Sequence, residues 1–401
     1  MSAMLRPIRL RSADGSEAGR RATWLELFFD LAFVAAVADV GTPLAMHYTP
    51  EGLIRYGFLF FLIWWAWLGH TLYSTRFDTD DVAQRLLTLA QIFGVAVMAI
   101  NADDALDSRS SAGFAAAYAG LRFLLAFQYA RARRVARARE FATTSAIGYG
   151  TAAALWLVSA LAPLAVRFEL WGLALLVDLG TALVTARHTH RLPHDAAHLP
   201  ERFGLFTIIL LGESLVAVTR GMKTQETWTV PAASSALLGI AMAFTFWWWY
   251  FDGVAGAAER FVQSRRDTRL FHLWAYAHLP LYIGIGIAGI GAEHVVRFAP
   301  AGHLDGSEAW MLCGGLATAM AALTTIAASQ PHGRIGAVVI LRHYTVAMAT
   351  LVLGIAGARV PPAHFLFALV ALQLSQLVIS LRGAPSADAV RFESGAQAVQ
   401  R

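Results

Sequence analysis

The chain has 401 residues, of which 57% are apolar and 15% are charged, whereas a typical soluble domain has about 25% charged residues. This composition excludes an ordinary soluble protein. The net charge of +5 does not indicate nucleic-acid binding, because the basic residues stand in short segments between apolar runs, where they set membrane orientation. The single cysteine, Cys313, lies in an apolar run and excludes a disulfide framework or a multi-thiolate metal site.

Apolar runs of membrane-spanning length recur along almost the whole chain, since about 20 helical residues cross a hydrocarbon core of about 30 Å. They are continuously apolar rather than alternating, which predicts helices and not the strands of a lipid-exposed barrel. We therefore expect an all-α polytopic membrane protein with about twelve transmembrane helices. The expected spans are 24–45, 53–73, 84–106, 112–131, 141–163, 168–186, 203–219, 232–255, 270–291, 309–328, 335–357 and 363–381.

These spans predict an organisation in two membrane halves. The expected parts are a cytoplasmic tail (1–23), a first six-helix half (24–186), a cytoplasmic linker (187–202), a second six-helix half (203–381) and a cytoplasmic tail (382–401). Most of the 32 Lys and Arg residues fall on the side of the N-terminus when the spans alternate in this way. The positive-inside rule therefore predicts an even number of spans with both termini in the cytoplasm.

Two aromatic stretches suggest that the second half repeats the first. Trp64 to Trp67 in the second span resembles Trp247 to Tyr250 in the eighth, and the Leu27-Phe28 pair of the first span resembles Leu205-Phe206 in the seventh. These matches predict two parallel six-helix repeats, related by an axis along the membrane normal. The alternative is that aromatic residues simply gather at the membrane interfaces.

Ionisable residues inside the spans are the strongest functional signal. A charged side chain at the bilayer centre costs about 2.5 to 3.5 kcal/mol, so it needs either a partner or a function. Glu213 lies near the expected midplane, and Asp178 and Arg122 lie at a similar depth. The two interpretations are an ion or proton site lined by acids, and a structural pairing of Glu213 or Asp178 with Arg122.

Glu26 and Asp30 share one face of the first span by their four-residue spacing, close to its cytoplasmic end. Two like charges at this spacing raise the pKa of one of them, which suits a proton or cation site. For Glu26 the alternative is a helix N-terminal acid stabilised by the helix dipole.

An acidic loop follows the second span, with Asp78, Asp80 and Asp81 within four residues. Carboxylates of this kind are ligands for Mg²⁺ or Ca²⁺, but the loop has no EF-hand spacing. The pattern favours a solvated loop that caps the third span.

A histidine-rich loop precedes the seventh span and contains His188, His190, His194 and His198, followed by Glu201 and Arg202. Clustered imidazoles can bind a transition metal, but neither a His-Glu-x-x-His pattern nor companion cysteines are present. We therefore predict no metal site here.

Gly284-x-Gly286-x-x-Gly289 has the letters of a dinucleotide fingerprint. It falls within a membrane span and follows no βα unit, so it predicts close helix packing instead.

Three stretches together resemble the bacterial low temperature requirement A (LtrA) family: Glu26 to Leu31, Arg76 to Asp81, and His198 to Ser214. The resemblance covers residues 20–380 and implies a multi-pass protein of the bacterial inner membrane, while implying little about activity. It adds weight to the residues within these motifs, which are Glu26, Asp30, Asp78, Asp80, His198, Glu201, Arg202 and Glu213.

The sequence favours a proton- or cation-linked channel or secondary transporter. Glu213, Asp30 and Glu26 are the expected proton or cation ligands, Arg202 is a paired cation, and a cytoplasm-facing vestibule containing His198 and Glu201 leads to Glu213. The alternatives are an integral membrane enzyme with a cytoplasm-facing His/Asp/Glu site, and a non-catalytic membrane sensor or scaffold. We expect the bilayer and a small ion or solute as partners and no cofactor, and whether the chain forms a homo-oligomer stays open.

Overall fold

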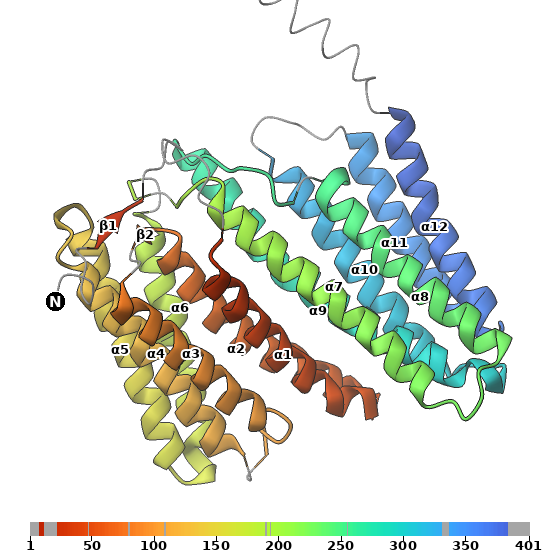
Figure 1. Cartoon of the computed structure of the whole chain (residues 1–401), viewed down its shortest axis with the longest axis horizontal. Helices are drawn as coiled ribbons and strands as arrows, with labels where there is room; N and C mark the ends of the chain where they lie inside the picture. Colours follow the sequence, from red (N-terminus) through yellow and green to blue (C-terminus); the bar gives the residue numbers. More distant parts are fainter. Residues whose placement is uncertain are drawn as a thin grey trace, which may run out of the picture.

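The computed structural model of the chain describes residues 8–11, 22–46, 48–78, 81–107, 110–188, 191–192, 194–254, 256–330 and 337–383. Long helices make up most of these residues, which confirms the predicted all-α fold (Figure 1). The helices are α1 (Trp24–Met46), α2 (Pro50–Ser74), α3 (Val82–Ile100), α4 (Ser111–Ala132), α5 (Arg139–Leu161), α6 (Leu164–Ala186), α7 (His198–Lys223), α8 (Val230–Trp248), α9 (Arg265–Phe298), α10 (Gly306–Ala328), α11 (Ala337–Gly357) and α12 (Pro362–Gly383).

Eleven of these helices are long and apolar enough to cross a membrane. The remaining one, α4, is of similar length but carries Arg122, Gln128 and Arg131. It packs against α2, α3 and α5, so these polar groups lie on a helix with protein neighbours on several sides. Each of the twelve predicted spans overlaps one helix of the structure, although the ends differ, and the predicted residues 255, 335 and 336 lie outside the described residues.

Polar residues at the helix starts fix where the spans begin. Asp81 caps α3, because its Oδ1 accepts the Gln84 backbone N–H at 2.7 Å. The acidic loop therefore caps the third span as expected, although Asp81 is buried and pairs with Arg131 at 2.9 Å. Asp78 belongs to the short strand β2 (Phe77–Asp78), which pairs with β1 (Arg9–Leu10), whereas Asp80 and His190 lie outside the described residues.

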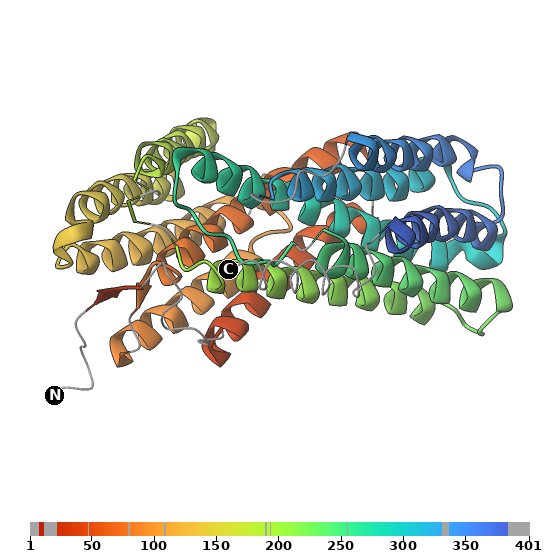
Figure 2. The ribbon, with the colours of Figure 1, turned by 90° about the horizontal axis from the view of Figure 1, so that it is seen from above.

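The helices form two groups that meet along α1 and α7. Figure 1 places α3 to α6 on the left and α8, α10, α11 and α12 on the right, with α9 beside α7 across the middle, and Figure 2 shows the same division from above. Within the first half, α1 packs on α2 and α3, and then α3, α4, α5 and α6 pack in succession. The second half shows the corresponding order, with α7 on α8 and α9 and then α9 to α12 in succession, but α8 also packs on α12, whereas α2 packs on α4 instead. This agreement is consistent with the predicted repeat, which stays a prediction.

The glycine motif of α9 is a packing device, as predicted. A Cβ on Gly284 would lie 2.7 Å from the backbone of Gly315 and Ala319, so α9 and α10 approach each other closely there. Gly286 instead faces Tyr56 of α2, and Gly289 faces Ser214 of α7. The three glycines therefore let three different helices pack against α9.

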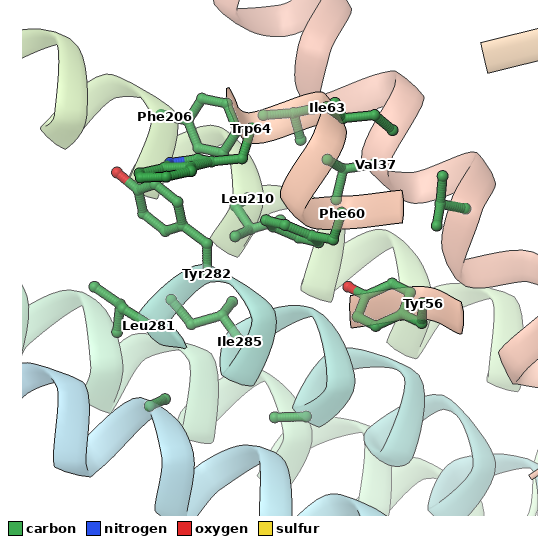
Figure 3. Packing of buried hydrophobic residues seen from close by; sticks show 14 of the residues in the cluster. Val37, Tyr56, Phe60, Ile63, Trp64, Phe206, Leu210, Leu281, Tyr282 and Ile285 are labelled. Carbon is green, nitrogen blue, oxygen red and sulfur yellow. The ribbon is translucent and has the colours of Figure 1, made fainter. Parts of the chain in front are cut away.

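Between α2, α7 and α9 lies a fully buried apolar layer, defined here as Phe60, Phe206, Leu210, Tyr282 and Ile285 (Figure 3). The rings of Phe206 and Tyr282 stack with their centroids 4.8 Å apart. The Tyr282 hydroxyl donates to the backbone carbonyl of Phe203 at 2.9 Å.

Candidate functional site

At the N-terminal ends of α1 and α7, two pairs of polar residues face each other. Glu26 and Asp30 are four residues apart on α1, and His198 and Arg202 are four residues apart on α7, so each pair lies on one face of its helix. The four side chains are in contact with one another, and we call them the inner ladder. Sequence spacing could show that each pair shares a face, but not that the two faces meet.

The centre of the inner ladder is a bidentate ion pair. Arg202 Nε donates to Asp30 Oδ2 at 2.8 Å, and Arg202 Nη2 donates to Asp30 Oδ1 at 2.6 Å. Both side chains are completely buried. The Trp67 indole N–H also donates to Asp30 Oδ1, at 2.7 Å. Both carboxylate oxygens of Asp30 are therefore satisfied by protein donors.

Glu26 lies one helical turn before Asp30, at the end of the inner ladder nearest the start of α1. Its Oε1 lies 3.3 Å from Arg202 Nη1, and its Oε2 lies 3.3 Å from His198 Nε2. Thr23 and Glu26 also form a reciprocal cap, since the Thr23 N–H donates to Glu26 Oε2 at 2.8 Å and Glu26 N–H donates to Thr23 Oγ1 at 3.3 Å. Glu26 thus helps to cap the start of α1 and joins this helix to α7.

Two residues that precede α1, Arg11 and Ala22, contact the start of α7 at this end of the inner ladder. Arg11 Nη1 lies 2.6 Å from His198 Nδ1. Because arginine can only donate, Nδ1 accepts and the proton is on Nε2, which faces Glu26. Glu201 lies beside the inner ladder, and its Oε2 accepts the Ala22 backbone N–H at 3.0 Å. These contacts hold the segment before α1 against the start of α7.

Glu213 lies in a different place. It lines a cavity of about 250 Å³ towards the C-terminal ends of α1 and α7, with α2 and α9 forming the other walls. Arg220 Nη1 lies 2.8 Å from Glu213 Oε1, and Arg220 Nε lies 3.1 Å from Glu293 Oε2. Glu213 is eleven residues beyond Arg202, or about 16 Å along α7. The buried apolar layer stands between the inner ladder and this cavity.

Arg122 and Asp178 belong to neither region. Arg122 Nε lies 2.6 Å from Asp178 Oδ2, both side chains are buried, and Arg122 Nη2 donates to the Tyr118 hydroxyl at 2.8 Å. The pair joins α4 to α6. This geometry is the structural pairing that the sequence offered as one of its two interpretations.

His194, a buried residue of the histidine-rich loop, has protein side chains at both ring nitrogens. Its Nε2 accepts from Arg76 Nη2 at 2.7 Å, and its Nδ1 lies 3.2 Å from Thr75 Oγ1. Burial, together with the Arg76 guanidinium, holds the pKa of His194 well below its usual range. Within the described ranges, no group of three or more His, Cys, Asp or Glu side chains is placed to hold a metal ion.

Sequence reasoning missed several residues that the structure places in these regions: Trp67 at the inner ladder, and Asp39, Tyr56, Arg220 and Glu293 at the cavity. Two signals were available. Asp39 is an acid within the first apolar run, and Arg220 follows Glu213 by seven residues, which puts both on one helix face.

Comparison with known proteins agrees with this architecture. The family described as bacterial low temperature requirement A protein (LtrA) matches residues 21–380, a range that contains the inner ladder motifs, Glu213 and all but the last three residues of α12. An uncharacterized protein of Rhizobium meliloti (strain 1021) is 30% identical over 290 residues, which are 68% of this chain and 69% of that protein. With eleven helices able to span a membrane, this is a multi-pass membrane protein. The chain belongs to the bacterial low temperature requirement A family.

Proposed function

We propose that the protein is a proton- or cation-linked secondary transporter of the bacterial inner membrane, with both termini in the cytoplasm. One observation carries the proposal: polar regions lie at the two ends of the α1–α7 interface, and a buried, mainly apolar layer lies between them in the described part of the chain. A carrier that alternates its access needs such a barrier between two half-paths. The closed layer favours a carrier over a channel, which would need a continuous path.

The inner ladder acts as the cytoplasmic gate in this proposal. Breaking a buried ion pair by removing one partner costs about 3 to 5 kcal/mol, so the gate opens only when another event offsets that cost. Protonation of Asp30 or Glu26 is such an event, because it removes the negative charge that holds Arg202. Glu213 is the proton or cation ligand on the other side of the layer.

The rigid helix α7 links the two regions, since it carries both Arg202 and Glu213. A movement of α7 against α1 that separates Arg202 from Asp30 therefore also moves Glu213 within its cavity. This provides the coupling between ligand binding and gating that a carrier requires.

The enzyme alternative has less support. It needs accessible imidazole and carboxylate groups at the cytoplasmic end, yet His198 is almost completely buried and both of its ring nitrogens contact side chains. Both ring nitrogens of His194 likewise contact side chains, those of Thr75 and Arg76.

The test is flux into liposomes that contain the purified protein, under imposed K⁺, Na⁺ and pH gradients. We expect flux in the wild type, its loss in Glu213→Gln and its reduction by at least about tenfold in Asp30→Asn, as for loss of a charge-assisted hydrogen bond. Glu169→Gln, an exposed carboxylate on α6, should leave flux unchanged. Unchanged flux in folded Glu213→Gln, or no wild-type flux under any gradient, would overturn the proposal.

A further inference from the structure

We propose that the cavity between α1, α2, α7 and α9 binds a small organic monocation, such as an alkylammonium ion, with Asp39 as its charge partner and Tyr56 as a second contact. This inference rests on the proposed function only in making that cation the transported solute. The binding site itself follows from the charges, the polar groups and the size of the cavity.

One carboxylate in the wall of the cavity has no arginine partner. Arg220 is shared between Glu213 at 2.8 Å and Glu293 at 3.1 Å, and Arg297 lies 3.9 Å from the same Glu293. Two arginines therefore offset two glutamates. Asp39 also lines the cavity as an exposed side chain at its rim, and it forms no ion pair with any residue that the structure describes. The cavity thus carries one uncompensated negative charge, which a monocation neutralises.

Tyr56 provides a second polar group in the wall of the cavity. Its side chain is 3% exposed and lines the cavity, and its hydroxyl reaches from α2 towards α9, where it lies against Gly286 (Figure 3). In the described part of the chain this hydroxyl has no hydrogen-bond partner. A hydroxyl that faces a cavity without a protein partner is free to bond to a ligand N–H or to a water.

The size and walls of the cavity favour an organic cation over a bare metal ion. Its volume of about 250 Å³ is far larger than one dehydrated ion and lies just below the roughly 300 Å³ at which drug-sized pockets begin. Val37, Leu210, Ala217 and Ile290 supply apolar walls. A hard cation needs a nearly complete shell of oxygen ligands, whereas alkyl groups suit apolar walls and an ammonium suits a carboxylate beside an aromatic ring.

Equilibrium binding to the full chain in lipid nanodiscs tests this inference by isothermal titration calorimetry. The probes are the chlorides of methylammonium, dimethylammonium and tetramethylammonium, with sodium and potassium chloride as the inorganic arm. We expect saturable binding of an alkylammonium and affinity at least about tenfold weaker in Asp39→Asn. Tyr56→Phe, which keeps the ring, should weaken binding of N–H-bearing probes about fivefold, as for a neutral hydrogen bond.

Asp104→Asn is the matched control, because Asp104 is an exposed carboxylate in the α3–α4 loop that does not line the cavity. It should bind as the wild type does. The inference is overturned if no alkylammonium binds, if only Na⁺ or K⁺ binds, or if folded Asp39→Asn retains wild-type affinity. Since no gradient is applied, binding without flux would refute transport alone, and flux without alkylammonium binding would refute this site alone.

Discussion

The inner ladder makes a quantitative prediction about stability. In Arg202→Met, Asp30 keeps only the Trp67 N–H as a partner, and in Asp30→Leu the Arg202 guanidinium keeps Glu26 at 3.3 Å. Each single change leaves a buried charge without its main partner, which costs about 3 to 5 kcal/mol of unfolding free energy. The double variant removes both charges, and replacing a buried pair by apolar groups is often neutral. We therefore expect the double variant to be more stable than either single variant.

Arg55 and Asp107 form a matched control pair. Their N–O distance of 2.7 Å is close to the 2.6 Å of Arg202 and Asp30, but their side chains are 36% and 53% exposed. Such a pair contributes at most about 1 kcal/mol. Unfolding in mixed micelles with increasing SDS, followed by tryptophan fluorescence, measures all variants on one scale. The reasoning fails if Arg202→Met costs no more than Arg55→Met, or if the Arg202 and Asp30 effects simply add.

Three further predictions use the same assay. Gly284→Ala should destabilise by about 1 to 3 kcal/mol because its Cβ meets the α10 backbone, whereas Gly180→Ala, with open space around it, should be neutral or stabilising. Trp67→Phe should cost about 1.5 to 3 kcal/mol, since Asp30 loses a hydrogen bond to its charged carboxylate. The pKa of His194 is lower in the folded chain than in the unfolded chain, so the unfolded chain binds more protons below pH about 6.5. The stability difference between wild type and His194→Gln should therefore shrink by up to about 1.4 kcal/mol per pH unit as the pH falls. A pH-independent difference would contradict this last prediction.

The spans were predictable because hydrocarbon imposes a long apolar run, but their ends were not. The ninth span was expected at 270–291, whereas α9 covers Arg265–Phe298. Ser264 and Asp267 form a capping box that begins the helix before the apolar run, and polar residues continue it beyond. In the same way α7 begins at His198, five residues before the expected span. An apolar run therefore predicts the part of a helix that lies in the hydrocarbon core, whereas capping residues determine where the helix begins and ends.

The candidate site was predictable only one helix at a time. Helical spacing puts Glu26 and Asp30 on one face, but Arg202 is 172 residues away from Asp30 along the chain, and no local pattern states which helix will lie opposite. Arg202 also precedes the apolar run, so it was expected in a linker near the membrane surface. It is instead completely buried, because a bidentate carboxylate makes burial of a guanidinium tolerable.

The geometry of α7 argues that the inner ladder and the cavity respond together. Arg202 and Glu213 are eleven residues apart, which at about 100° per residue is about 20° more than three full turns, so both project from nearly the same face. That face lies against α1 at one end, where Arg202 meets Asp30, and lines the cavity at the other, where Glu213 meets Arg220. A rotation or tilt of α7 that releases Arg202 must displace Glu213 as well. We therefore expect the two polar regions, which one helix presents on one face, to move together in the proposed carrier.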